Sequence, residues 1–397
     1  MADALQSQQA MSLSLGFQIL GLALVAIIAI HHRWLAVRIH VRSRPEPLRW
    51  PRLAVLRPIR GLDPGAAQNL DALLDSDYPG SIEFLFLLDD ADDASFPLVE
   101  AAIARHSQLR ARIVLTGTPP PHRTGKIHKM IHGADLVDAD VLAFSDSDTR
   151  PQPGMLRELV SLLESDPRNG IAFAPTVAVA EDVHTGDVGY ELLVNAWYGA
   201  AVDRVAGERG EVPFAMGQLM LIRTTALAAI GTMRAAEGEL VDDMFLGRKM
   251  IEHGYANVTC STRVPVVIGG MALVEFLRVF RKWIFFSQSG LPTAFKTAGW
   301  MRALPGFGAW ATTIAGMAIG SAWVIAVGLL ALAAFVASQV RLSSTLGGSP
   351  IAPRFYWLAA MMPFFASGVA LSTKLNHEVG WRGRRYRLDH AGRLRAV

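Results

Sequence analysis

An uncharged apolar run followed by a row of arginines is the feature that most constrains this chain. Leu13–Ile30 contains no charged side chain, and its length is close to the roughly 20 residues that a helix needs to cross a bilayer. A secretory signal peptide would carry positive charge before its apolar core, but Asp3 is the only charged residue that precedes this run. We therefore expect residues 1–32 to form an uncleaved transmembrane anchor.

The arginines after the run predict the orientation of the chain. Positions 33–62 hold eight arginines and a single acidic residue, Glu46. Positive charge is retained on the cytoplasmic side of a membrane, so we expect the N-terminus outside and the residues after the anchor in the cytoplasm. In a bacterium this membrane would be the inner one.

A second apolar region lies near the C-terminus, within residues 303–374. Positions 303–340 hold no charged residue, and Phe355–Thr373 is a further apolar stretch. Six arginines follow within residues 375–397, which predicts a basic cytoplasmic tail. Two spans joined by an outside loop near residues 341–354 satisfy this orientation. The alternative, two spans within the first run, would leave the tail outside.

The composition agrees with a membrane protein and excludes some functions. Hydrophobic residues make up 51% of the 397 residues and charged residues 18%, against about 25% charged residues in a typical soluble domain. The net charge of +3 is too small to indicate nucleic-acid binding. Cys260 is the only cysteine, so no disulfide can form within the chain, which fits a reducing compartment.

Residues 53–268 alternate between short apolar runs and segments of helical spacing, which predicts a cytoplasmic α/β domain. Strands that alternate with helices favour a mostly parallel sheet flanked by helices. Ligands of such folds bind beyond the carboxyl ends of the strands. The expected strands are 53–57, 82–88, 111–115 and 141–144, and the expected helices are 69–74, 96–106 and 127–137.

Acidic residues follow two of these strands. Asp90 belongs to a cluster of four aspartates at positions 89–93, and Asp146 and Asp148 flank Ser147. Mg²⁺ and Mn²⁺ prefer oxygen ligands and are often held by one or two carboxylates together with substrate phosphates. A diphosphate leaving group needs such a cation, because negative charge builds on it as its bond breaks. Aspartates also occur in turns for structural reasons alone, but two clusters at strand ends favour a cation site.

A third acidic pair, Asp242 and Asp243, precedes a segment of helical periodicity at residues 244–251. One interpretation is helix capping, which aspartate does well. The other is a general base that accepts the proton of an attacking hydroxyl. Residues 272–286 predict an amphipathic helix at the membrane interface, in a region that extends to residue 300. A surface helix whose basic side chains snorkel is the alternative.

Several motifs share their order and spacing with one enzyme family. They are an opening segment, a first aspartate, a lysine motif, an Asp-x-Asp motif, a glycine segment, a third aspartate and a tail motif: Leu56–Pro64, Asp90, Lys126–Ile127, Asp146–Asp148, Met216–Arg223, Asp243 and Trp381–Arg387. From about residue 53 to 254, and again at the tail, the chain resembles the family-2-type glycosyltransferases, and most closely the ceramide glucosyltransferases. The resemblance implies a GT-A-type, Rossmann-like fold.

The resemblance also implies roles for individual residues. Some would bind the nucleotide sugar, some would hold the metal, one would be the base, and two would lie on the acceptor side. These are Asp90, Lys126, Asp146, Arg281 and Trp283 for the nucleotide sugar, Asp146 and Asp148 for the metal, Asp243 as the catalytic base, and Gly217 and Asp242 on the acceptor side.

Two motifs depart from the family pattern. The family has an arginine directly followed by a tryptophan, whereas Lys282 here separates Arg281 from Trp283. Either Arg281 fills the arginine position, or Lys282 and Trp283 form the pair. The lysine motif carries His128 and Lys129 where the family favours asparagines.

The residues themselves predict an enzyme that uses a nucleotide sugar and a divalent metal, Mg²⁺ or Mn²⁺, on a lipid at the cytoplasmic face of a bilayer. The resemblance implies direct displacement with inversion, UDP-glucose as the donor and ceramide as the acceptor. One alternative is the same chemistry on a hopanoid, another lipid or a polysaccharide. A polysaccharide synthase usually carries more membrane spans than this chain shows. The other alternative is a non-catalytic membrane scaffold whose acidic turns cap helices.

Overall fold

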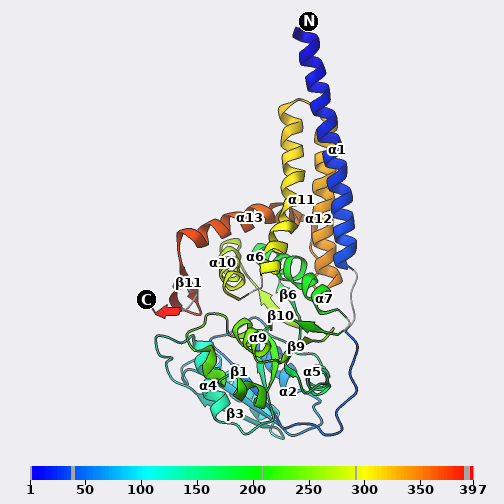
Figure 1. Cartoon of the computed structure of the whole chain (residues 1–397). Coiled ribbons are helices and arrows are strands. Elements are labelled where there is room, and N and C mark those ends of the chain that lie inside the picture. The colour runs from blue at the N-terminus through cyan, green and yellow to red at the C-terminus, as the bar shows by residue number, and fades with distance from the viewer. Residues whose placement is uncertain (1, 37–40, 208, 291–292, 389–393, 397) are drawn as a thin grey trace.

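The computed structural model describes residues 2–36, 41–207, 209–290, 293–388 and 394–396. Figure 1 shows a sheet domain at one end of the molecule and a bundle of long helices that extends away from it. Helix α13 lies across the end of the bundle nearest the sheet domain, and the chain then returns to that domain. The N-terminus lies at the far end of the bundle.

A sheet of eight strands forms the centre of the domain, in the order β3-β2-β1-β4-β8-β5-β9-β7. Strands β1 to β4 run parallel to one another, while β8 is antiparallel to both of its neighbours, β4 and β5. Strands β6 and β10 form a separate parallel pair. The strands are β1 (Leu53–Pro58), β2 (Ile82–Leu88), β3 (Arg110–Leu115), β4 (Val141–Ser145), β5 (Asn169–Phe173), β6 (Thr176–Asp182), β7 (Glu211–Val212), β8 (Leu219–Arg223), β9 (Ala256–Thr259) and β10 (Val264–Gly269).

Helices cover both faces of the large sheet because its central strands are apolar on both faces. Leu56, Leu85 and Phe144 pack with α4, α8 and α9 on one face. Val55 and Phe86 pack with α2, α3 and α5 on the other, as is typical of parallel strands. The helices of this domain are α2 (Ala66–Leu74), α3 (Phe96–Arg105), α4 (Gly125–Asp135), α5 (Met155–Glu164), α6 (Thr185–Glu191), the π-helix η1 (Leu192–Gly199), α7 (Ala200–Ala206), α8 (Thr224–Ala229), the 3₁₀ helix η2 (Met233–Ala236), α9 (Asp242–Glu252) and α10 (Leu273–Gly290).

The predicted α/β class, with a mostly parallel sheet, flanking helices and candidate membrane helices toward both ends, is confirmed. The four predicted strands correspond to β1–β4, and their ends agree within one residue. The antiparallel strand β8 was not predicted. It lies beside β4 and therefore borders the strand end that carries Asp146 and Asp148.

The uncharged run at residues 303–340, for which we expected one span, contains two helices. Gly320 has a φ of 67° and lies in the turn between them. Ser321 then caps the second helix by accepting a hydrogen bond from Val324 N. Hydropathy does not detect this turn, because it contains no charged residue. The bundle consists of α1 (Ala2–Ala36), α11 (Thr293–Ala318) and α12 (Ala322–Thr345), which lie side by side in Figure 1.

Helix α13 (Tyr356–Leu375) follows a single 3₁₀ turn, η3 (Pro353–Phe355). The loop before it, which we expected outside the membrane, contacts the sheet domain instead. Ser349 Oγ donates to Ala180 O at 3.3 Å and accepts from Ala180 N at 3.1 Å. This loop therefore lies at the end of the bundle nearest the sheet domain, which does not fit a loop on the opposite side of a membrane from that domain. Three described segments are long and apolar enough to cross a membrane, Ser14–Ala36, Ala322–Thr345 and Pro353–Leu375.

The basic tail folds into a small antiparallel sheet beside the large domain. Its Val379 and Tyr386 are buried against Leu240 and Phe285, and Leu394 N donates to Gly238 O at 2.9 Å. The strands of this tail sheet are β11 (Glu378–Trp381), β12 (Arg384–Leu388) and β13 (Leu394–Ala396).

Candidate active site

A cavity of about 250 Å³ lies beyond the carboxyl ends of β1 and β4. Lys126 and four aspartates form its polar lining, and aromatic residues of α6, η1 and α10 form an apolar lining. The tail sheet contributes Arg382, Arg384 and Tyr386. The four aspartates are Asp146, Asp148, Asp242 and Asp243, and the aromatic residues are Tyr190, Trp197, Tyr198, Trp283 and Phe286.

Asp146 and Asp148 follow β4 in a loop that backbone hydrogen bonds fix on two sides. Asp146 N donates to Gln218 O at 2.9 Å, and Asp148 O accepts from Val267 N at 2.8 Å. Burial, followed by the charges of Asp146 and Asp63, raises the pKa of Asp148 to about 6. Asp148 Oδ1 is buried and accepts no hydrogen bond from the described residues. A buried carboxylate oxygen without a donor fits a cation ligand.

Arg57 supports this loop from the interior of the domain. It is 1% exposed, and its guanidinium donates to the carbonyl oxygens of Ser147 at 2.8 Å, Thr149 at 2.9 Å and Asn69 at 3.2 Å. Burial lowers the pKa of Arg57 to about 10, against the opposing charges of the nearby aspartates. The guanidinium is therefore charged at neutral pH, and it stabilises the acidic loop.

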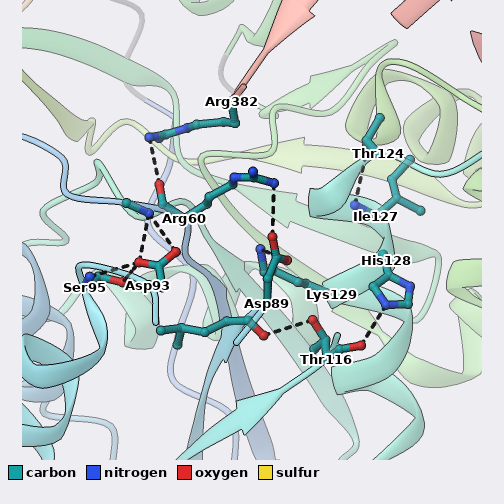
Figure 2. A network of polar contacts seen from close by, with 12 residues as sticks. Arg60, Asp89, Asp93, Ser95, Thr116, Thr124, Ile127, His128, Lys129 and Arg382 are labelled. Atoms are coloured by element: carbon teal, nitrogen blue, oxygen red, sulfur yellow. Dashed lines mark hydrogen bonds and ion pairs between the residues drawn. The ribbon is translucent and has the colours of Figure 1, made fainter. Parts of the chain in front are cut away.

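Lys126 lies between the two acidic pairs. Its Nζ is 2.7 Å from Asp146 Oδ1 and 3.8 Å from Asp242 Oδ2. Helix α4 begins here, and Thr124 caps it by accepting a hydrogen bond from Ile127 N (Figure 2). Burial opposes the charge of Lys126, but the surrounding carboxylates raise its pKa far above the ordinary value. The ammonium group therefore links the loop after β4 to the start of α9.

Asp243 lies in the first turn of α9, beside the buried Asp242. Its Oδ2 accepts from Gly217 N at 2.6 Å, and its Oδ1 accepts from Met244 N at 2.8 Å. A Cβ at position 217 would lie 3.1 Å from Asp243 Oδ2 and 3.2 Å from Lys126 Nζ, so glycine permits this approach. Burial, followed by the charge of Asp242, raises the pKa of Asp243 to about 7. Such a carboxylate is suited to accept a proton at neutral pH.

Helix α10 brings Lys282 and Trp283 to the cavity, but not Arg281. The Arg281 guanidinium donates to Glu378 O at 2.6 Å and to Asn376 O, so it holds the start of the tail sheet. Of the two registers left open by the sequence, this arrangement matches the one in which Lys282 and Trp283 form the pair.

The two residues present different chemistry to the cavity. The Trp283 ring centroid lies 5.6 Å from that of Tyr198 and 6.3 Å from that of Tyr190. Burial, followed by the charge of Arg382, lowers the pKa of Lys282 to about 8. Helix α10 therefore supplies an aromatic surface and a cation side by side.

Asp90, the predicted nucleoside contact, is exposed after β2 and does not line the cavity. Its Oδ1 accepts from Asp92 N at 3.0 Å. Asp89, one residue earlier, is turned inward and lies 2.7 Å from Lys129 Nζ and 3.1 Å from Arg60 Nη1 (Figure 2). Both cations line the cavity, so Asp89 contacts the lining and Asp90 does not.

Most of the predicted site residues converge, although their chemical roles stay predictions. Gly217 contacts Asp243 through its backbone amide, whereas Asp90 and Arg281 lie away from the cavity. The predicted residues that line the cavity are Lys126, Asp146, Asp148, Asp242, Asp243 and Trp283.

Sequence reasoning missed several charged residues whose partners lie inside the domain. These are Arg57, Asp63, Asp89, Lys129 and Arg382. One signal in the sequence was Arg57 itself, which is a charged residue within an apolar strand. Charged residues are rarely buried unless they are paired, so Arg57 indicated a partner inside the domain. Another was the tail motif, which contains Arg382 but had no assigned role.

Comparison with known proteins gives one family for nearly the whole chain. Residues 18–394 match the family described as Glycosyl transferase family 21. The chain is 22% identical to ceramide glucosyltransferase 1 of Caenorhabditis elegans, over 68% of this chain and 56% of that protein. It is 27% identical to the ceramide glucosyltransferase of Komagataella phaffii, over 38% of this chain and 32% of that protein. The matches therefore span about half of the first relative and a third of the second.

One solved structure covers most of the chain. It is the mannosyltransferase PcManGT from Pyrobaculum calidifontis in complex with GDP-Man and Mn²⁺. The two chains are 19% identical, with a TM-score of 0.48, and the match covers 90% of this chain and 99% of that one.

Proposed function

The chain belongs to glycosyl transferase family 21, and on this basis we propose that it transfers a sugar from a nucleoside diphosphate to a hydroxyl group of a membrane lipid. The observation that carries the proposal is the pair of acidic sites that face one cavity on either side of Lys126. One pair has an oxygen free of hydrogen bonds from the described residues, and the other has a carboxylate suited to accept a proton. Glycosyl transfer to a hydroxyl needs both a cation ligand at the diphosphate and a base for the proton.

Asp146 and Asp148 would hold the divalent metal, Mg²⁺ or Mn²⁺. Among the described residues no group of three or more His, Cys, Asp or Glu side chains could hold a metal. This suits a cation that two carboxylates share with substrate phosphates. When bound, the metal would neutralise charge on the diphosphate leaving group.

Asp243 would act as the general base in a single displacement. Its carboxylate takes the proton of the lipid hydroxyl while that oxygen bonds to the anomeric carbon. The bond from this carbon to the diphosphate oxygen breaks at the same time, and the nucleoside diphosphate leaves. Attack on the face opposite the leaving group inverts the configuration of the sugar. The positive charge of Lys126, which lies between the two acidic pairs, would reduce the electrostatic repulsion between them.

The remaining lining would bind the two substrates at different sides of the cavity. Lys282 would face the diphosphate, and Trp283 would contact the sugar or the acceptor. Gly217 and Asp242 border Asp243 and would lie on the acceptor side. Asp90 stays the predicted nucleoside contact, next in sequence to Asp89.

UDP-glucose and ceramide are the substrate pair that we propose, because the curated relatives are ceramide glucosyltransferases. The cavity supports a lipid acceptor through its apolar lining, which includes Trp197, Tyr198 and Phe286. Arg302, near the base of α11, also lines it. The cavity thus adjoins the helix bundle as well as the sheet domain.

The bundle suggests how the enzyme sits at its membrane. Helices α1, α11 and α12 would cross, because α11 packs beside the other two although it is not among the three candidate spans. The sheet domain would lie on the cytoplasmic side that the arginine distribution predicts. Helix α13 would lie along the surface, because it runs across the bundle (Figure 1) and exposes Trp357, Phe364 and Leu371. This arrangement keeps the basic tail in the cytoplasm with an even number of spans between the sheet domain and the tail.

The direct test uses the purified chain in nanodiscs with radiolabelled UDP-glucose, ceramide and Mn²⁺. We expect a chloroform-extractable labelled lipid from the wild type, formed about 10²- to 10⁴-fold more slowly by Asp243→Asn. If another lipid in the assay becomes labelled and ceramide does not, the proposed acceptor is wrong and the proposed reaction stands. If no product forms and neither UDP nor Mn²⁺ shifts the melting temperature, the scaffold alternative is supported instead.

A further inference from the structure

The turn between β11 and β12 carries an arginine in an unfavourable backbone conformation. Arg382 has a φ of 47° and Gly383 a φ of 78°, the left-handed pair that two-residue hairpins use. Asparagine and glycine adopt this region readily, whereas other residues do so at a cost in free energy. Thr232 is the only other non-glycine residue with a positive φ among the described positions. An arginine at this position therefore indicates a role for its side chain.

The Arg382 side chain extends from the turn to the lining of the cavity. Its Nη2 lies 2.8 Å from Asp63 Oδ1. Its Nη1 donates to Arg60 O at 3.3 Å, as Figure 2 shows. It lines the same cavity as Asp146 and Asp148. The last part of the chain thus brings a guanidinium to the proposed metal loop.

The surroundings of Arg382 suit an anion with more than one charge. Asp63 is 9% exposed on its side chain and also accepts a hydrogen bond from Ser147 Oγ, so its charge is shared between two donors. Lys282 lines the cavity as well, and burial, followed by the Arg382 charge, lowers the pKa of that lysine. Two cations that line one cavity suit an anion with more than one charge. A guanidinium binds phosphate oxygens in a bidentate manner.

The tail sheet is held in place by contacts other than those of Arg382. Arg281 binds the carbonyl oxygens that precede and begin β11. Tyr386 is buried against Leu240 and Phe285, and Leu394 is bonded to Gly238. The Arg382 side chain can therefore change its partner while the sheet stays in position.

We propose that Arg382 binds the diphosphate of the donor, and that it pairs with Asp63 when no donor is bound. The inference rests on the proposed function and deepens it, since it gives the tail motif a role in donor binding. The phosphate oxygens would replace the Asp63 carboxylate as partners of the guanidinium, beside Lys282 and opposite the metal loop.

The first test compares two nucleotides on one variant. Arg382→Asn removes the guanidinium and leaves a residue suited to a positive φ, so the full chain in nanodiscs should melt at the wild-type temperature or above. With Mn²⁺ present, calorimetry should show UDP binding weakened about 10- to 100-fold, as expected for lost charge-assisted hydrogen bonds. The affinity for UMP should change by less than about threefold, because UMP lacks the second phosphate. Equal losses for UDP and UMP, or no loss, would overturn the proposal.

The matched control is Arg385→Ala. Arg385 lies in β12, three residues after Arg382, is exposed and does not line the cavity, so its loss should leave the UDP affinity unchanged. A loss equal to that of Arg382→Asn would mean that the tail acts through its general charge, which would refute a specific contact.

A second variant separates a ligand contact from a structural one. If Arg382 binds the diphosphate, Asp63→Asn frees the guanidinium and keeps the Ser147 contact, so UDP affinity is retained or rises. If Arg382 serves only to hold Asp63, then Asp63→Asn and Arg382→Asn weaken UDP binding alike, and the proposal fails. A wild-type chain that binds no UDP at all contradicts the proposed function itself, and that result is known before any variant is measured.

Discussion

The two acidic pairs of the cavity have similar sequences and different surroundings. Asp146 and Asp148 lie in an irregular loop after a strand, above the buried Arg57. Asp242 and Asp243 begin a helix. Both pairs contact Lys126, so they share one cation but not one environment.

This difference separates the chemistry that each pair can perform. Asp148 keeps one buried oxygen without a hydrogen bond from the described residues, and the pKa of its carboxyl is about 6. Both Asp243 oxygens accept backbone hydrogen bonds, yet the pKa of its carboxyl is about 7. Asp242 Oδ2 is also buried without a hydrogen bond from the described residues, but it lies 3.8 Å from Lys126 Nζ. The open oxygen of Asp148 therefore suits a cation, and the raised pKa of Asp243 suits proton transfer. Environment rather than residue type therefore assigns the roles, a pattern common to enzymes with two carboxylates.

The largest effect expected from this comparison is that of Asp243→Asn on turnover. Loss of a general base typically lowers the rate about 10²- to 10⁴-fold, and we expect kcat measured with labelled UDP-glucose to fall in this range. The affinity for UDP with Mn²⁺, measured by calorimetry, should stay near the wild-type value. A normal kcat would show that the helix pair does not supply the base.

Arg57→Met tests whether Arg57 stabilises the loop that carries Asp146 and Asp148. It leaves three backbone carbonyl oxygens without their donor and the aspartates without a buried cation, so we expect a loss of about 3 kcal/mol in the free energy of unfolding. Chemical denaturation of the detergent-solubilised chain measures this loss. The control is Arg52→Met, because Arg52 is ion-paired with Asp138 and Asp140 at the surface and should matter much less. Equal effects would contradict the supporting role of Arg57.

Asp148→Asn tests the cation site directly. Removal of one carboxylate should weaken Mn²⁺-dependent UDP binding by about 10- to 100-fold, the range seen when a metal site loses supporting groups. UDP titrations with and without Mn²⁺ measure the effect. If Asp243→Asn weakens this binding as strongly as Asp148→Asn does, the two acidic pairs do not have separate roles.

The smallest effect is a change of rate with pH. Asp243 must be ionised to accept a proton, and the pKa of its carboxyl is raised to about 7. The rate at saturating Mn²⁺ should therefore rise with pH up to about 7 and fall about tenfold for each unit below it. A profile that is flat from pH 5.5 to 7.5 would mean that another group takes the proton, or that a step other than chemistry limits turnover.

The first half of the large sheet could be predicted from the sequence, because each strand from β1 to β4 is a short apolar run between polar turns. The pairing of β8 could not. Leu219–Arg223 is almost entirely apolar, as a parallel strand would be, so its antiparallel pairing leaves no mark in the residues themselves. The turn at Gly320 was missed because no charged residue interrupts the run, and its only marks are Gly320 and the capping Ser321.

The acidic half of the site could be predicted because strand ends of a parallel sheet converge on one edge. Of the cations, Lys126 was predicted through the resemblance. The others were not, because they are defined by partners far away in the chain. Asp63 and Arg382 are separated by 319 positions and form one ion pair. Arg281 and Lys282 are neighbours in sequence, but only the fold decides that one holds the tail sheet and the other lines the cavity.

The tail sheet has a consequence for the order in which the enzyme becomes competent. Its residues are translated after α11 and α12, yet they line the cavity and pack beside the segment that carries Asp243. A nascent chain whose sheet domain has already folded would still lack this part of the cavity lining. We therefore expect sugar transfer to begin only after α11 and α12 have entered the bilayer. An incompletely inserted chain would then not consume nucleotide sugar.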